Sequence, residues 1–140
     1  MDELNLQRYQ VITESGRPIE IEYDQDGDML EIFFQKGPAT NAIELAAPII
    51  LRFDRESGMA VSLSILTFSR VIEKTELGPR SFRIDGLDAL PDALRKIVSN
   101  IITSPPVSTF LKVSTYYPQT EQRPVALSYL ERSVALPLAA

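Results

Sequence analysis

Apolar and polar residues alternate along much of the segment from Ile19 to Leu66, and this alternation limits the fold more than any other feature of the chain. A side chain that returns to the same face at every second residue is typical of a half-buried β-strand. Two such runs flank Asp26-Gly27, a pair that favours a two-residue hairpin turn because both turn positions need a positive φ. This turn sets Tyr23 opposite Leu30 and predicts that the apolar residues of the hairpin share one face.

A second hairpin is predicted between Ile49 and Leu66. Its loop, Glu56-Ser57-Gly58, is typical of a three-residue turn with the glycine in the left-handed region. This loop sets Phe53 opposite Val61 and Leu51 opposite Leu63. Shorter elements are expected around the hairpins: a weak strand within residues 3–13, for which a frayed or helical segment is the alternative, a short strand or bulge at residues 43–45, and a helical turn within residues 67–74.

The second half of the chain contains the clearest helix pattern. Its apolar residues recur every three or four positions and form one stripe: Leu94, Ile97, Val98, Ile101 and Ile102. We expect this helix over residues 91–103, with Pro91 in its first turn and Pro105-Pro106 beyond its end. Strands are expected at residues 81–85, 107–117 and 125–131, with a helix as the alternative for the last of these.

These elements predict an α+β fold in which an antiparallel β-sheet meander packs against one amphipathic helix, residues 91–103, and additional C-terminal strands. The segment from Thr75 to Arg80, which contains Gly78-Pro79, is the best internal boundary. At its start, the chain divides into an antiparallel β module, residues 1–74, and a helix with strands, residues 75–140. We expect the second part to pack on the first as one structural unit.

The face of the first hairpin opposite its apolar set carries several charges. The predicted register places Glu22 directly opposite Glu31, and like charges in this position destabilise a sheet. We therefore expect a basic residue close to them. Arg52, on the neighbouring hairpin, is the first candidate and Arg8 is the second.

Two apolar side chains near these charges, Phe33 and Ile50, predict that the face is covered. We favour cover by the helix stripe of the chain itself, and a dimer or partner interface is the alternative. Tyr116 and Tyr117 either add an aromatic anchor to an interface or simply end a strand. The candidate interface comprises Glu20, Glu22, Met29, Glu31, Phe33, Ile50, Arg52, Tyr116 and Tyr117.

The amino-acid composition excludes several kinds of catalytic and metal-binding site. The chain has no cysteine and no histidine, which excludes thiolate metal sites and the Ser-His and Cys-His schemes of catalysis within one chain. Its glycines are isolated, so no phosphate-binding loop is predicted. Asp24, Asp26 and Asp28 match a calcium loop only in spacing, because Met29 and Gln35 occupy the positions of the required glycine and glutamate. We expect a solvated hairpin tip at this turn, and a weak surface calcium site is the alternative. We expect no metal site, no cofactor and no catalytic residue in the rest of the chain.

The net charge is −5 and no segment is a basic run, so nucleic acid is not an expected partner. No apolar run approaches the roughly 18 residues that a membrane-spanning helix needs. The acidic N-terminal residues lack the basic and apolar regions of a signal peptide. We expect a cytoplasmic protein that does not enter a membrane.

Two blocks of residues stand out in the hairpins: Tyr23-Asp24, Asp28, Leu30, Ile32 and Phe34 in the first and Asp54, Gly58, Val61, Leu63, Ile65 and Leu66 in the second. With these residues the two hairpins resemble a small bacterial protein family, domain of unknown function 2283. The resemblance covers residues 18–70 and implies a short, cytoplasmic, antiparallel β module with no established activity. Ser64 stands where the family often has an acidic residue, and residues 75–140 have no counterpart in it.

The leading hypothesis for function is a non-enzymatic protein-interaction module that forms a homodimer or binds and neutralises a small basic protein. Open sheet edges allow strand addition, and the negative charge would steer a basic partner. The alternative is a small-molecule or metal-ion binding domain with a pocket between the helix at residues 91–103 and the sheet. An enzyme that uses tyrosine, lysine and carboxylate groups is a third hypothesis, without a recognisable constellation.

Overall fold

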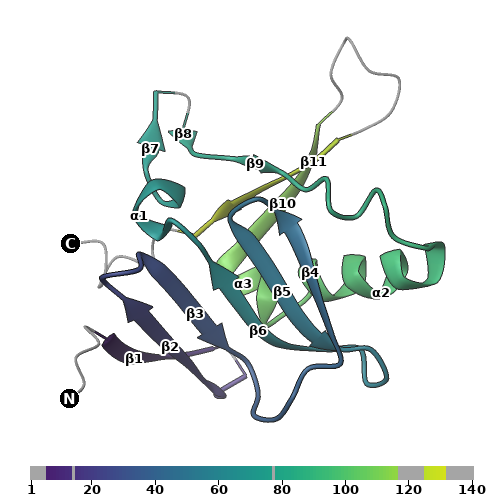
Figure 1. Cartoon of the computed structure of the whole chain (residues 1–140), viewed down its shortest axis with the longest axis horizontal. Coiled ribbons are helices and arrows are strands. Elements are labelled where there is room, and N and C mark those ends of the chain that lie inside the picture. Colours follow the sequence, from purple (N-terminus) through teal and green to yellow (C-terminus); the bar gives the residue numbers. More distant parts are fainter. Residues whose placement is uncertain (1–5, 14, 77, 117–124, 132–140) are drawn as a thin grey trace.

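The computed structural model describes residues 6–13, 15–76, 78–116 and 125–131. Six of the described strands form one antiparallel sheet in the order β1-β2-β3-β6-β5-β4 (Figure 1). The predicted α+β class with an antiparallel meander is confirmed. In chain order these strands are β1 (Leu6–Ile12), β2 (Pro18–Asp24), β3 (Met29–Phe33), β4 (Asn41–Ala46), β5 (Ile49–Asp54) and β6 (Met59–Ile65).

The first hairpin, β2 and β3, has the predicted register. Tyr23 lies opposite Leu30 and Glu22 lies opposite Glu31. The alternation of the sequence reappears as alternating burial along β2 and β3. A slip of one residue would exchange the two faces, so the apolar pattern selects this register.

The turn of this hairpin differs from the predicted two-residue turn. Asp24 pairs with Met29, which leaves a four-residue loop, and the left-handed residue is Asp28, with φ 53°. Asp24 Oδ1 accepts hydrogen bonds from the backbone N–H groups of Asp26 at 3.1 Å and Gly27 at 3.2 Å. Two-residue and four-residue loops place the same residues opposite each other, so the error in the turn leaves the register intact.

The second hairpin, β5 and β6, agrees with the prediction at one end only. Leu51 lies opposite Leu63, and Gly58 has the expected positive φ, 70°. Phe53 lies opposite Ala60 and not opposite Val61, because the register shifts beside Arg52. Such a bulge places an additional residue in one strand, and here it removes Val61 from its predicted partner.

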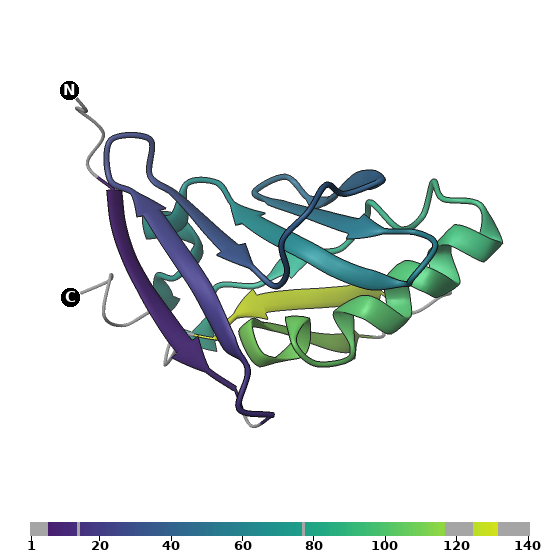
Figure 2. The ribbon, with the colours of Figure 1, turned by 90° about the horizontal axis from the view of Figure 1, so that it is seen from below.

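A second layer of short elements lies on one face of this sheet (Figure 2). The predicted helix runs from Asp92 to Ile102, and the strand predicted at residues 125–131 is confirmed. The strand predicted at residues 107–117 is wrong in its first part, because residues 107–110 form a helical turn. In chain order the elements after β6 are α1 (Phe68–Val71), β7 (Lys74–Thr75), β8 (Gly78–Pro79), β9 (Phe82–Arg83), α2 (Asp92–Ile102), α3 (Val107–Phe110), β10 (Leu111–Tyr116) and β11 (Val125–Leu130).

These later strands form two small sheets. β9, β10 and β11 make a three-stranded sheet in the order β10-β11-β9, and β7 pairs with β8 in a short ribbon. The ribbon occupies the segment around Gly78-Pro79, which the sequence indicated as the best boundary. Gly86 follows β9 and crosses the edge strand β4, where its N–H donates to the carbonyl of Leu45 at 3.1 Å.

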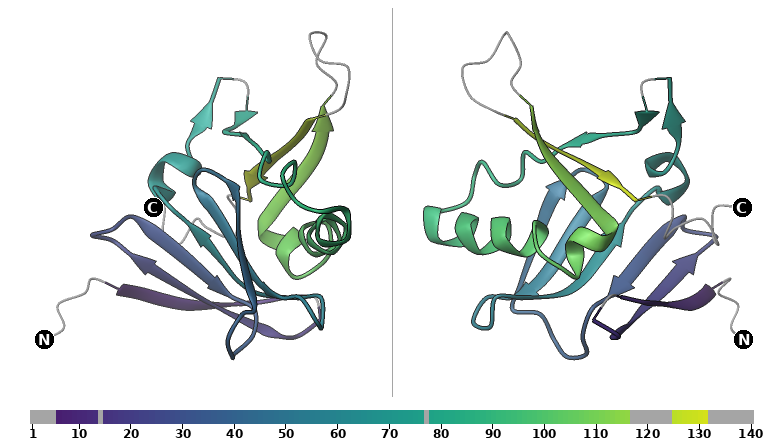
Figure 3. Two further views of the ribbon diagram at one scale, coloured as in Figure 1. Left: turned by 45° about the vertical axis from the view of Figure 1, so that its right-hand side comes forward. Right: turned by 180° about the vertical axis from the view of Figure 1, so that it is seen from behind.

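The hydrophobic core lies between the large sheet and the second layer. A single cluster of buried residues includes Ile21 and Leu63 from the sheet and Val98 and Ile101 from α2. The rings of Phe34 and Phe110 meet across the two layers with centroids 6.0 Å apart. Figures 2 and 3 show α2, α3, β10 and β11 on this face of the sheet. The expectation that the α2 stripe covers Phe33 and Ile50 is therefore wrong, since both lie on the opposite face.

Candidate functional site

The opposite face of the large sheet, here called the outer face, brings together most of the predicted interface. Glu20, Glu22, Met29, Glu31 and Phe33 reach it from the first hairpin, and Ile50 and Arg52 reach it from β5. Strand β6 lies between these two groups, because it pairs with both β3 and β5. Two serines of β6 that the sequence pattern did not indicate, Ser62 and Ser64, therefore lie at the centre of the outer face.

The expected repulsion between Glu22 and Glu31 is relieved by both predicted arginines. Arg52 Nη1 donates to Ser64 Oγ at 2.6 Å, and Ser64 Oγ donates to Glu31 Oε1 at 2.7 Å. The guanidinium itself lies 3.9 Å from Glu31. On the other side, Arg8 Nε donates to Glu22 Oε2 at 3.1 Å. Each carboxylate of the opposed pair thus has its own cation.

Ser64, which lies between Arg52 and Glu31 in this series of hydrogen bonds, is almost fully buried although it belongs to the outer face. Ser64 is 1% exposed, because Glu31 and Arg52 close over it from the neighbouring strands. A buried hydroxyl costs free energy unless it is hydrogen-bonded, and this one both accepts and donates. Ser64 therefore links two strands through side chains in addition to the backbone ladder.

Beside this network the outer face is hollowed. The hollow has a volume of about 830 Å³ and lies where the loop of residues 35–39 rises next to β3 and β6. Phe33 and Val61 provide its apolar floor, and the bulge in β6 explains why Val61 is available there. The charged residues that line it are Glu20 and Glu22 from β2, Arg52 from β5, and Arg17 and Lys36 from loops. The hollow therefore combines an apolar floor with charged walls of both signs.

The three aspartates of the first turn do not converge. Asp28 Oδ1 accepts a hydrogen bond from the Tyr23 hydroxyl at 2.7 Å, and its carboxylate also binds Ser69 through the backbone N–H at 3.0 Å and the hydroxyl at 2.6 Å. Asp24 is used by the turn itself. Among the residues that the structure describes, no group of three or more acidic side chains is placed to hold a metal ion.

The pKa values of Asp28 and Tyr23 in this cluster are shifted in opposite directions. Burial would by itself raise the pKa of Asp28, but the hydrogen bonds from Ser69 and Tyr23 outweigh it and lower the pKa. Burial raises the pKa of Tyr23 to about 12, helped by the hydrogen bond and the charge of Asp28. The cluster joins the first turn to α1, which gives Asp28 a structural role.

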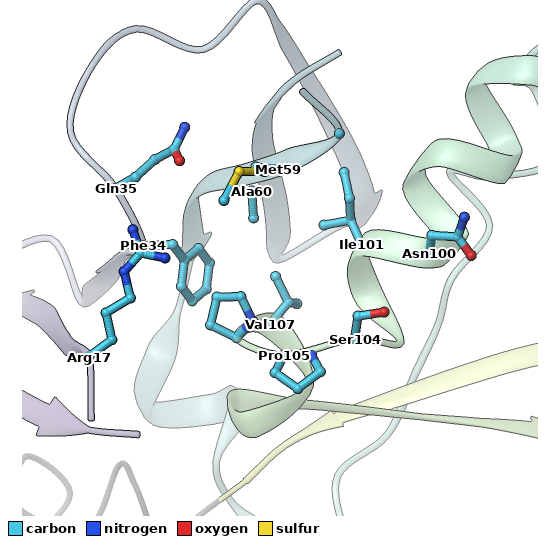
Figure 4. Close-up of a pocket in the computed structure, with 12 residues that line it drawn as sticks. Arg17, Phe34, Gln35, Met59, Ala60, Asn100, Ile101, Ser104, Pro105 and Val107 are labelled. Carbon is cyan, nitrogen blue, oxygen red and sulfur yellow. The ribbon is translucent and has the colours of Figure 1, made fainter. Parts of the chain in front are cut away.

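A small pocket lies between α2 and the sheet, where the alternative hypothesis for function places a ligand. Figure 4 shows Phe34, Ala60, Ile101 and Val107 around it. Its volume is about 190 Å³, which is below the roughly 300 Å³ of typical ligand pockets. It adjoins a larger groove of about 870 Å³ that runs from Met59 past Pro105 and Pro106 to Lys112.

Of the two tyrosines predicted as an anchor, Tyr116 does not join the outer face. Tyr116 ends β10, opposite Val125, in the small sheet of the second layer. Tyr117 lies outside the described residues. The remaining residues of the candidate interface are brought together on the outer face, whereas Tyr116 belongs to a different part of the fold.

In its described part, the chain belongs to the class of antiparallel β-sheets with one face packed on helices and the other face uncovered. Residues 20–69 match the model of a family described as a protein of unknown function (DUF2283). The resemblance seen in the sequence is confirmed for this segment, which spans β2 to α1. No curated protein and no solved structure matches the chain. In the described part of the chain, no helix is long and apolar enough to cross a membrane.

The family resemblance falls on residues that shape the two hairpins. Asp54 has the same position before its loop as Asp24, and its Oδ2 accepts a hydrogen bond from the N–H of Ser57 at 3.2 Å. The last residue of each loop, Asp28 or Gly58, adopts a positive φ. These contacts explain the shared residues through folding, without invoking a reaction.

Proposed function

We propose that the chain is a non-enzymatic protein-interaction module and that the outer face is its contact surface. The observation that carries this proposal is the hollow with its floor of Phe33 and Val61 between charged walls. Interfaces obtain most of their affinity from a few side chains that enter such pockets, surrounded by polar groups that exclude water. The partner is a small protein that inserts an apolar or aromatic side chain above Phe33.

The charges around the hollow would orient this partner. Glu20 and Glu22 lie on one side, and Arg52 lies on the other. A partner with the complementary arrangement would dock in one direction, because opposed like charges are costly. The net charge of −5 would also speed the approach of a basic partner at low ionic strength.

A pull-down with matched variants tests the proposal. Immobilised chain is used to capture proteins from the cells that encode it, and mass spectrometry identifies them. Phe33→Ala should weaken the binding of a true partner roughly 30-fold, as expected for an interface anchor. Glu20→Gln/Glu22→Gln should weaken it less and mainly at low salt. Glu56→Gln/Asp88→Asn removes the same charge elsewhere and should leave binding unchanged. Binding that ignores Phe33→Ala in a folded variant would refute the outer face as the contact surface.

A second candidate function is the binding of a small anionic amphipathic molecule in the groove lined by the end of β1 and by α3. The groove is lined by apolar residues such as Val11, Met59 and Pro106 together with Arg17 and Lys112, and no carboxylate is found among the described residues that line it. Met59, which lines the groove, is 43% exposed and adds to its accessible apolar surface. The chain as a whole is acidic, so a groove with only cations is a specific feature.

Thermal denaturation with decanoate tests this second candidate. Decanoate should raise the melting temperature, decanol should raise it less, and Arg17→Gln should reduce the difference between them. Equal effects of the acid and the alcohol would show that no anion site exists in the groove.

A further inference from the structure

The two edges of the large sheet differ in how they are protected. At the β4 edge, the register shifts between Glu44 and Ala46. Gly86 then crosses this edge and binds the carbonyl of Leu45, so close that a side chain at Gly86 would collide with the backbone of Glu44. Bulges and covering segments are devices that prevent an edge strand from pairing with another chain.

Among the described residues, the β1 edge has neither a bulge nor a covering segment. Strand β1, Leu6–Ile12, pairs with β2 in an unbroken register, and no described element lies along its other side (Figures 2 and 3). It contains no proline, and Arg8 is its one charged residue. Its end residue Ile12 is 64% exposed, the highest value for a large apolar side chain in the described part of the chain.

The hydrogen-bond pattern shows which backbone groups of β1 face outward. The N–H of Thr13 donates to the carbonyl of Arg17 at 3.2 Å, so this pair points toward β2. Hydrogen-bonded and non-bonded pairs alternate along an antiparallel ladder. Val11 and Tyr9 therefore also bond to β2, and the N–H and C=O groups of Ile12, Gln10, Arg8 and Leu6 point away from the sheet.

We propose that β1 pairs with β1 of a second copy of this chain, antiparallel about a twofold axis at Tyr9. The inference rests on the proposed role in protein interaction and names one partner for it, at the sheet edge and not at the outer face. Homodimers with twofold symmetry are the commonest oligomers. The sheets of the two copies would become continuous, with both outer faces on the same side.

Geometry selects one register for this pairing. The outward backbone groups belong to alternate residues, so they meet only if each such residue lies opposite another of the same set. The same condition keeps the core faces of both copies on one side. The register that uses the whole strand sets Leu6 opposite Ile12 of the second copy, Arg8 opposite Gln10 and Tyr9 opposite Tyr9.

The side chains are compatible with this register. Leu6 would cover the exposed Ile12 of the second copy, and no like charges would lie opposite each other. Arg8 is already bound to Glu22 within its own chain at 3.1 Å. Gln10 lies opposite Glu20 in its own chain and would lie opposite Arg8 of the second copy, so position 10 faces opposite charges across the two ladders.

Substitutions of Gln10 separate dimerisation from folding. Gln10→Lys places a cation opposite Glu20 of its own chain, which favours the folded monomer, and opposite Arg8 of the second copy, which opposes dimerisation. Gln10→Glu should destabilise the folded monomer, because it faces Glu20, and favour dimerisation, because it faces Arg8 of the second copy. Sedimentation velocity across a concentration series should therefore show a dimer in the wild type, a dimer weakened about ten-fold by Gln10→Lys and a dimer strengthened by Gln10→Glu.

Amide hydrogen exchange provides an independent readout. The amides of Arg8, Gln10 and Ile12 should exchange quickly at low concentration and slowly at high concentration, whereas those of Tyr9 and Val11 should be protected in both.

A chain that stays monomeric at about millimolar concentration overturns the inference, as does a dimer that both Gln10 variants affect in the same direction. If the wild type is monomeric but captures a partner that Phe33→Ala does not bind, the edge dimer alone is refuted. If the wild type forms the dimer but captures no partner whose binding depends on Phe33, the outer face alone is refuted.

Discussion

At the scale of single residues, Asp28 connects parts of the sequence that are far apart. Its positive φ closes the first turn, its carbonyl accepts a hydrogen bond from the N–H of Phe68 at 2.9 Å, and its carboxylate binds Tyr23 and Ser69. Aspartate tolerates the left-handed region better than most residues. The residue therefore satisfies the turn, the start of α1 and the Tyr23 hydroxyl together.

Asp28→Ala should lower the free energy of unfolding by about 2–3 kcal/mol, because it leaves several partners unsatisfied and places alanine at a positive φ. Urea denaturation at pH 7 measures the loss, with the exposed Asp88→Ala as control. A change below about 0.5 kcal/mol would contradict the structural role of Asp28.

Because the pKa of Asp28 is lowered, the stability that its side chain contributes should be lost at low pH. Because the pKa is below its ordinary value of 3.8, the ionised carboxylate is favoured in the folded state. The contribution is fully present above pH 3.8 and is lost as the pH falls through the folded-state pKa. Wild-type chain should therefore lose more stability than Asp28→Asn between pH 5 and pH 2. Parallel curves for the two proteins would show that Asp28 does not titrate in this way.

For Tyr23 we expect the opposite pH dependence, with stability lost at high pH. Its pKa is raised from 10.0 to about 12, so the neutral phenol is favoured in the folded state. The resulting stability is complete below pH 10 and is lost as the pH rises toward 12. Denaturation at pH 9 and pH 11.5 should show a larger fall for the wild type than for Tyr23→Phe, and ultraviolet absorbance should follow the ionisation itself.

At the scale of elements, side chains of four neighbouring strands, β2, β3, β6 and β5, act together where β2 pairs with β3. Glu31 lies between Glu22 on one side and Ser64 on the other, and Arg52 reaches it from one strand further. The charges of the outer face thus act across strands and not within one hairpin. Surface ion pairs contribute little individually, but here their removal would leave an opposed pair of carboxylates.

Arg52→Ala should cost about 0.5–1 kcal/mol at neutral pH, because Glu31 would lose its cation while facing Glu22. In the Glu31→Gln background the same substitution should cost less, since the repulsion is already absent. A double-mutant cycle by urea denaturation measures this coupling. Equal costs in both backgrounds would indicate that Arg52 and Glu31 do not interact.

Gly86→Ala should destabilise the fold by about 3 kcal/mol, because its Cβ would collide with the backbone of Glu44 and overpacked sites relax poorly. Asp88→Ala, two residues further along the same exposed segment, should change stability by less than about 0.5 kcal/mol. Thermal denaturation of both variants checks the difference. A stable Gly86→Ala variant would show that this segment can move away from β4.

At the scale of the whole molecule, the core depends on both halves of the chain. Ile21, Ile32 and Leu63 are each at most 1% exposed, and they belong to the same cluster as Val98 and Phe110. The large sheet therefore has no buried face without the second layer. A sheet with one uncovered apolar face tends to aggregate or to remain unfolded.

A chain that ends at residue 74 should not form a stable fold, and its amide resonances should be poorly dispersed in a ¹H–¹⁵N spectrum. Addition of a separately expressed segment 75–140 should restore dispersion if the two halves recognise each other. A well-dispersed spectrum of residues 1–74 alone would instead make the first half an independent domain.

The sequence by itself determined the register of the first hairpin, the location of α2 and the charge compensation by Arg52 and Arg8. All three follow from local spacing: period two for strands, a spacing of three or four for helices, and the effect of like charges placed opposite each other. The family resemblance added the extent of the hairpin segment, which the match over residues 20–69 confirms.

Only the tertiary structure decided the remaining features, because they depend on contacts between distant residues. Asp28, and not Gly27, takes the left-handed position, and Asp28 is held by Ser69. Val61 joins the hollow because of a bulge that alternation does not predict. An apolar helix stripe fits any apolar surface, so periodicity could not tell that α2 covers the core face and leaves Phe33 beside solvent.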